Sequence, residues 1–141
     1  MSKRNAINAQ MKQDLISAYR EVAPKCWRQW DAYKRTVTHP APRFYVTPKQ
    51  AYQKVKKALE GDTSEIERMK PNRQRLYMCL CRLTIEATQE REFQGKSLWY
   101  IMPFIVTRPA PEFYITPKHL GFLFNEYQKE KRKMIGQTLS K

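Results

Sequence analysis

The sequence has little glycine, little cysteine and no long apolar run. Its 4 glycines are scattered, so it contains no glycine-rich phosphate-binding loop. The 3 cysteines, Cys26, Cys79 and Cys81, are spaced for neither a disulfide framework nor a zinc site. We therefore expect reduced cysteines that pack as small apolar side chains. The longest apolar run, Leu98 to Val106, is interrupted by Pro103 and is far shorter than the ~20 residues that cross a bilayer. Because no signal or lipidation motif begins the chain, we expect a cytoplasmic protein without membrane contact.

Acidic side chains are also scarce relative to basic ones. The 141 residues include 27 Lys and Arg against 13 Asp and Glu, for a formal net charge of +14. The basic excess is present in both halves of the chain, so it is not a charged tail. With 41% hydrophobic and 12% aromatic residues, the chain has enough apolar material for a core. The balance indicates a folded domain that neutralises phosphates.

An internal repeat at a separation of 69 residues organises the chain. Val37–Lys49 recurs as Val106–Lys118 with ten of thirteen positions identical, and Trp30 recurs as Trp99. Two copies are too few for a solenoid. We predict a single domain over 1–141 with a pseudo-two-fold internal duplication, its halves at about 5–70 and 71–133, and flexible ends at 1–4 and 134–141.

Each copy of the repeat predicts an extended segment, a short strand and a helix. The Pro-Ala-Pro sequence keeps the chain extended, and residues 44–47 and 113–116 are β-prone. Thr47 and Thr116 are suited to cap a helix that starts at Pro48 or Pro117. The predicted class is mainly α with two short β-strands (α+β). Whether the two strands pair as a ribbon stays open, because isolated strands need helices to cover them.

Apolar spacing and capping residues predict helices in the rest of the chain. Ser97 is a cap for a helix whose continuation past Pro103 is doubtful, and Gly61 ends the helix that starts at Pro48. A capping-box pattern from Asp62 predicts a short helix that Pro71 terminates. The remaining predicted helices cover 7–22, a short segment near 27–30, 72–89 and the residues after 117.

Three segments together resemble a group of small, uncharacterised basic proteins from anaerobic gut-type bacteria and their mobile elements. These segments are Pro40–Ala51, Ser97–Phe104 and Pro109–Thr116, and the resemblance spans roughly Leu15 to Lys129. The group has no assigned activity. The resemblance therefore implies a setting and no mechanism.

The sequence shows no set of residues typical of a catalytic site. His39 and His119 occupy non-equivalent positions of the two copies and lack a neighbouring acid or nucleophile. Asp62, Glu65 and Glu67 form the only tight acidic cluster, and helix capping already explains two of them. We expect a non-enzymatic protein without cofactor, metal or small-molecule substrate.

Three basic clusters indicate the function most strongly. We expect them to contact nucleic-acid phosphates, with double-stranded DNA favoured over RNA. The middle cluster follows a short helix and opens a longer one, which resembles the layout of a helix-turn-helix unit. Phosphate contacts by Arg73 and Arg75 are the safer expectation, and base reading in the groove stays open. The candidate residues are Lys54, Lys56, Lys57, then Lys70, Asn72, Arg73, Gln74, Arg75, and finally Lys129, Lys131, Arg132, Lys133.

Two alternatives remain open. Tyr45 and Tyr114 could be stacking platforms for single-stranded bases. We favour a core in which both tyrosines are partly buried with their hydroxyls satisfied and Trp27, Trp30 and Trp99 pack beneath the helices. The alternative function is a structural or adaptor protein, in a virion or mobile-element assembly, that docks acidic protein partners.

Overall fold

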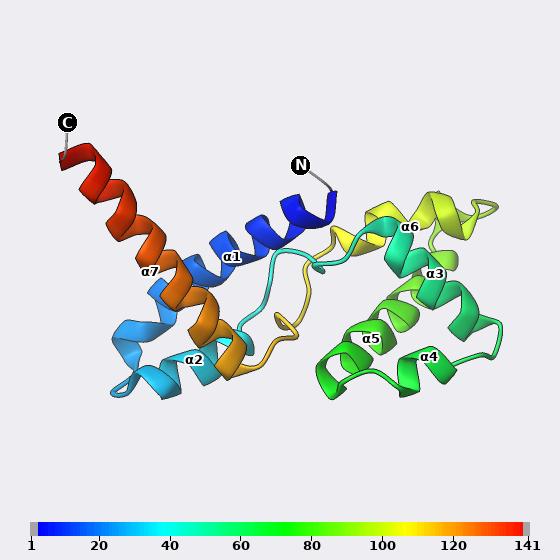
Figure 1. Cartoon of the computed structure of the whole chain (residues 1–141). Helices are drawn as coiled ribbons and strands as arrows, with labels where there is room; N and C mark the ends of the chain where they lie inside the picture. The colour runs from blue at the N-terminus through cyan, green and yellow to red at the C-terminus, as the bar shows by residue number, and fades with distance from the viewer. Residues whose placement is uncertain (1–2, 140–141) are drawn as a thin grey trace.

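The computed structural model describes residues 3–139, which fold as helices arranged in two lobes (Figure 1). The first lobe contains α1, α2 and α7, and the second contains α3 to α6. Two linkers, residues 38–47 and 107–116, run between the lobes. The elements are α1 (Lys3–Val22), η1 (Ala23–Lys25), α2 (Gln29–Val37), α3 (Pro48–Leu59), α4 (Ser64–Glu67), α5 (Pro71–Thr88), η2 (Arg91–Phe93), α6 (Leu98–Val106) and α7 (Pro117–Leu139).

The two copies of the repeat are intertwined. In each copy a helix, α2 or α6, leads through its linker to a helix in the opposite lobe, α3 or α7. Helix α3 packs against α5 and α6, and α7 packs against α2 and α1. Each lobe is therefore completed by a helix from the other half of the chain.

The predicted β-strands are wrong, because none is present among residues 3–139. One isolated antiparallel bridge joins the linkers, with Ala41 N donating to Ala110 O at 2.9 Å and Ala110 N to Ala41 O at 2.8 Å. The next donors of a ladder would be two residues away from each alanine, but His39 N donates to Thr36 O at 3.0 Å and Arg108 N donates to Ile105 O at 3.1 Å. Tyr114 has a φ of +57°, which takes the second linker out of the extended conformation. The fold is mainly α.

The linkers are held by the ends of helices instead. Phe44 N donates to Val106 O at 2.9 Å, and Phe113 N donates to Val37 O at 3.1 Å. These two bonds are related by the same 69-residue offset as the sequence repeat. The linker backbones thus satisfy the last carbonyls of α6 and α2, which helices leave without partners.

Aromatic side chains of the linkers form the centre of the core. Phe44 stacks on Tyr114 with ring centroids 6.1 Å apart, and Tyr45 stacks on Phe113 at 5.8 Å. Both tyrosines are at most 9% exposed, so they are core residues and not platforms for bases. Our placement of the tryptophans was wrong: Trp27 is fully exposed, and Trp30 and Trp99 are about half exposed.

The predicted starts of α3, α6 and α7 are confirmed. The capping box predicted from Asp62 is wrong, because the N-cap of α4 is Thr63 without a side-chain capping bond and Glu65 binds two lysines of α3 instead. Thr47 and Gln50 form a capping box on α3, and Thr116 Oγ1 accepts from His119 N on α7. Ser97 Oγ accepts from Tyr100 N, and α6 continues through Pro103, which the sequence had made doubtful. The three cysteines are free, with Cys79 buried in the core.

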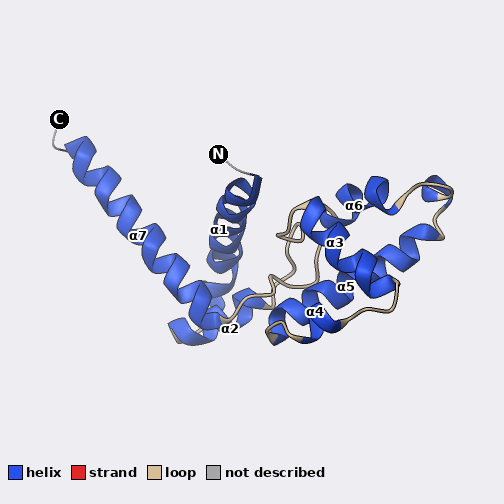
Figure 2. Ribbon diagram, turned by 45° about the vertical axis from the view of Figure 1, so that its right-hand side comes forward, coloured by secondary structure: helices blue, strands red, loops and turns tan. Residues whose placement is uncertain are grey.

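Both ends of the described chain are helical. Helix α1 starts at Lys3 and α7 continues to Leu139, within the ends 1–4 and 134–141 that we predicted to be flexible, and their flexibility stays a prediction. Residues 1–2 and 140–141 of these predicted ends lie outside the described residues. The distal half of α7 projects away from the other helices (Figure 2). Within residues 3–139, no helix has the length and apolar character needed to span a membrane.

Candidate nucleic-acid interface

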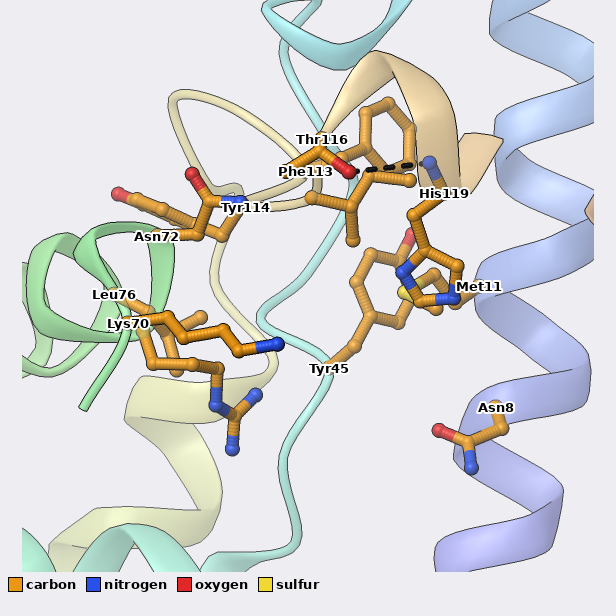
Figure 3. Close-up of a pocket in the computed structure, with 12 residues that line it drawn as sticks. Asn8, Met11, Tyr45, Lys70, Asn72, Leu76, Phe113, Tyr114, Thr116 and His119 are labelled. Atoms are coloured by element: carbon orange, nitrogen blue, oxygen red, sulfur yellow. Dashed lines mark hydrogen bonds between the residues drawn. The ribbon is translucent and has the colours of Figure 1, made fainter. Parts of the chain in front are cut away.

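A cavity of about 380 Å³ opens between the two lobes (Figure 3). Its walls come from α1, both linkers, the start of α5 and the start of α7, and they include the cations Lys70 and Arg73 and the imidazole of His119. No carboxylate is among the described residues that line it. A second cavity of about 210 Å³ shares Arg73 with the first and reaches Thr47 at the start of α3. We call the two together the inter-lobe cleft.

The start of α5 brings partial positive charge to the inter-lobe cleft. Lys70 is the extended residue before the helix, with φ −63° and ψ 153°, and its side chain makes no capping hydrogen bond. Pro71 occupies the first helical position. The N–H groups of the first turn of an 18-residue helix have no intrahelical acceptors and carry the positive end of its dipole. This end of α5 favours an anion in the cleft.

Lys70 and Arg73 add full charges at the same place. Lys70 is exposed, extends into the cavity in Figure 3, and has no hydrogen-bond or ion-pair partner among the described residues. Arg73 contacts Tyr77, with its Nη2 donating to Tyr77 Oη at 3.4 Å and its guanidinium 5.4 Å from the ring centroid. Burial raises the pKa of Tyr77, so this phenol stays neutral. Neither cation is neutralised by a described carboxylate.

The other predicted residues at the start of α5 are engaged within the protein. Gln74 Nε2 donates to the backbone carbonyls of Glu67 and Met69, which ties α4 to α5. Arg75 donates to Asn72 Oδ1 and forms an ion pair with Glu112 at 2.9 Å. The start of α5 faces the other lobe, whereas a recognition helix presents its first residues outward to a groove. The geometry favours phosphate contact by Lys70 and Arg73 over base reading.

The positive charge of the α3 cluster, Lys54, Lys56 and Lys57, is largely neutralised within the protein. Lys54 and Lys57 both bind the carboxylate of Glu65, and these hydrogen bonds lower the pKa of Glu65 to about 2. The same contact raises the pKa of Lys57. Lys56 lies 5.7 Å from the ring centroid of Tyr52 and has no carboxylate partner in the described part of the chain. Of this cluster, Lys56 has the most accessible charge.

The α7 cluster forms a separate basic arm. Its four cations, Lys129, Lys131, Arg132 and Lys133, are all exposed on the projecting part of the helix (Figure 2). No ion pair involves them among the described residues; the nearby Glu130 binds Lys12 at 3.3 Å instead. A rise of 1.5 Å per residue places this arm roughly 15–20 Å along α7 from His119. The structure therefore does not bring the third cluster to the cleft.

Sequence reasoning missed some residues of these surfaces. His119 was assigned no role from the sequence, yet it lines the inter-lobe cleft from α7, and Asn8 lines it from α1. No local signal places them there, because both depend on how the lobes meet. His39 is paired with Glu21 at 3.0 Å, away from the cleft.

Comparisons with known proteins identify no relative. No family model, no curated protein and no solved structure matches the chain. Across residues 3–139, no three His, Cys, Asp or Glu side chains are grouped so that they could hold a metal ion. The function must be inferred from the chemistry of the cleft and the basic surfaces.

Proposed function

We propose that this protein is a non-enzymatic nucleic-acid-binding protein that holds the phosphate backbone of double-stranded DNA. The observation that carries the proposal is the inter-lobe cleft, where Lys70, Arg73 and the uncapped start of α5 meet without a lining carboxylate. A phosphate in the cleft would interact with two cations and with helix N–H groups. The rest of the backbone lies across the mouth of the cleft.

The basic arm of α7 supports duplex DNA as the ligand. A helix with its side chains is about 10–12 Å wide, and the major groove of DNA is about 12 Å wide. The arm contacts α1 through the ion pair of Glu130 with Lys12, and its four cations are exposed. It reaches a duplex whose backbone occupies the cleft. A cytoplasmic setting, in a bacterium or its mobile element, is part of the same proposal.

The test is a titration of labelled duplex DNA and single-stranded RNA, measured by fluorescence anisotropy over a series of salt concentrations. We expect duplex binding whose log affinity falls linearly with log salt. The double variant Lys70→Gln with Arg73→Gln removes two phosphate contacts. It should make the slope of log affinity against log salt less steep by roughly 1.8. No binding to either polymer at low salt refutes the proposal.

A matched control separates the cleft from general charge. Lys25 and Arg28 are exposed cations in the turn between α1 and α2, outside the lining of the cleft. Lys25→Gln with Arg28→Gln changes the net charge by the same amount and should leave the slope nearly unchanged. If the two double variants weaken binding equally, the cleft is not the phosphate site.

A structural or adaptor role is the second candidate, and one observation favours it. An apolar groove of about 510 Å³ lies among α3, α4 and α5, and Leu59, Met78 and Ile85 are between 43% and 65% exposed there. Exposed apolar grooves of this kind are suited to protein partners. A chain that keeps its helical fold but binds neither polymer at low salt would favour this role.

A further inference from the structure

Helix α6 is apolar on every side, yet only one side is buried. Its nine residues, Leu98–Val106, include no charged side chain. A helix that is hydrophobic all round is normally covered all round. Its inner side lies in the core, whereas Trp99, Tyr100 and Phe104 on its outer side are 55%, 48% and 47% exposed. The described chain therefore covers the outer side only in part.

The rings of α6 contact rings of neighbouring segments in two groups, and one of these neighbours, Phe93, is itself buried. Trp99 meets Tyr52 of α3 edge-on with centroids 5.0 Å apart. Phe104 lies 5.5 Å from Tyr100 and 5.5 Å from Phe93 of η2. We call these five rings the α6 aromatic face. Its area consists of flat rings instead of the aliphatic side chains that dominate helix interfaces.

Cations from other segments frame this face. Lys56 Nζ lies 5.7 Å from the ring centroid of Tyr52, and Lys96 Nζ lies 5.2 Å from that of Tyr100. Neither lysine has a carboxylate partner among the described residues. Arg108 lies 5.8 Å from the Phe93 centroid and is paired with Glu90 at 2.9 Å. The surface therefore combines stacking rings with uncompensated positive charge at two edges.

The equivalent helix of the other repeat copy lacks this surface. Trp30 of α2 corresponds to Trp99, but Asp31 and Arg35 stand where α6 has Tyr100 and Phe104. The aromatic face is thus a property of α6 and not of the repeat. Trp30 is 51% exposed, which makes it a natural control.

We propose that the α6 aromatic face binds single-stranded nucleic acid, with unpaired bases stacked on Trp99, Tyr100 and Phe104 and flanking phosphates held by Lys56 and Lys96. Aromatic rings beside cations are the chemistry that binds single strands without sequence preference. A duplex cannot use this face, because its bases are already stacked. The inference rests on the proposed nucleic-acid-binding function and assigns it a second surface.

Tryptophan emission provides the direct test. Trp27→Phe with Trp30→Phe changes two exposed side chains and leaves Trp99 as the sole tryptophan. The probes are a short oligothymidylate and an abasic sugar-phosphate oligomer of equal length, which carries the same charge without bases. We expect the oligothymidylate to quench Trp99 emission and the abasic oligomer to leave it unchanged. Equal responses to both probes overturn the inference.

Affinity measurements complete the test. Trp99→Ala with Tyr100→Ala should weaken oligothymidylate binding roughly tenfold or more, while Trp30→Ala should have little effect. Duplex binding should be nearly unchanged in both variants. If oligothymidylate binds these variants equally and Trp99 is not quenched, the inference fails while the proposed function stands. If the wild-type chain binds no polymer at low salt, both fail.

Discussion

The hydroxyl of Tyr45 joins the first linker to α1. Its removal tests whether this contact stabilises the linker between the two lobes. The hydroxyl donates to Asp14 Oδ2 at 2.6 Å, and Tyr45 is 9% exposed. Burial and this hydrogen bond raise the pKa of Tyr45, so the phenol remains a donor at neutral pH. Tyr114, the equivalent residue of the second linker, lies against the thiol of Cys79 instead, and burial likewise raises its pKa.

Replacement of Tyr45 by Phe should lower the free energy of unfolding by about 2 kcal/mol. A buried hydrogen bond to a charged group contributes roughly 1.5–3 kcal/mol. Asp14 is partly exposed and also accepts from Gln10, which favours the lower part of that range. The ring and its stack on Phe113 are retained. For a chain of this length the melting temperature should fall by about 7 °C.

The matched variant is Tyr114→Phe, which loses only a weak contact with a thiol. We expect it to cost less than about 1 kcal/mol. Urea titrations at neutral pH measure both variants, and equal slopes against urea indicate that the unfolded states are comparable. If Tyr45→Phe and Tyr114→Phe lower the free energy of unfolding equally, the contact of Tyr45 with Asp14 does not stabilise the fold.

Other side chains allow further tests. Hydrogen bonds from Lys54 and Lys57 hold the pKa of Glu65 at about 2, below its ordinary value of 4.5. Because the folded-state pKa is lowered, this stabilisation is complete above about pH 4.5 and is lost as the pH falls towards 2. Glu65→Gln should therefore flatten the fall in stability across that window, measured by urea titrations at stepped pH; a curve parallel to wild type contradicts the pairing. Gly61 ends α3 with a φ of +99°, so Gly61→Ala should cost roughly 1–2 kcal/mol. In α7, a Cβ at Gly136 meets nothing within 4 Å, and Gly136→Ala should favour the helix by about 1 kcal/mol. Thermal melts followed by circular dichroism test both glycine variants. The melting temperature should fall for Gly61→Ala and rise for Gly136→Ala, and changes of the same sign contradict these expectations.

Local structure could be predicted well because its causes are local. Thr47 before Pro48 and Ser97 before Leu98 cap their helices with atoms three residues away. The strands could not be predicted correctly. Residues 44–47 favour extended geometry, but a strand requires a neighbouring strand to exchange hydrogen bonds with. Phe44 N and Phe113 N instead donate to Val106 O and Val37 O at the ends of helices.

The candidate site was predicted only in part. Charge and position identified Lys70 and Arg73, which line the inter-lobe cleft. Arg75 was expected to contact phosphate, yet it is paired with Glu112, 37 residues further along the chain. Its partner lies in the second linker and is brought to α5 by the fold. Such long-range pairing leaves no local pattern.

The sequence by itself determined the repeat, the helices and the excess of positive charge, because each depends on residue type and short spacing. Only the tertiary structure decided that α3 and α7 each pack in the lobe formed by the other half of the chain. Periodicity shows which side of a helix is apolar but not which neighbour covers it. This arrangement of α3 and α7 creates the inter-lobe cleft. It also leaves the outer side of α6 exposed, with its rings framed by lysines from other segments.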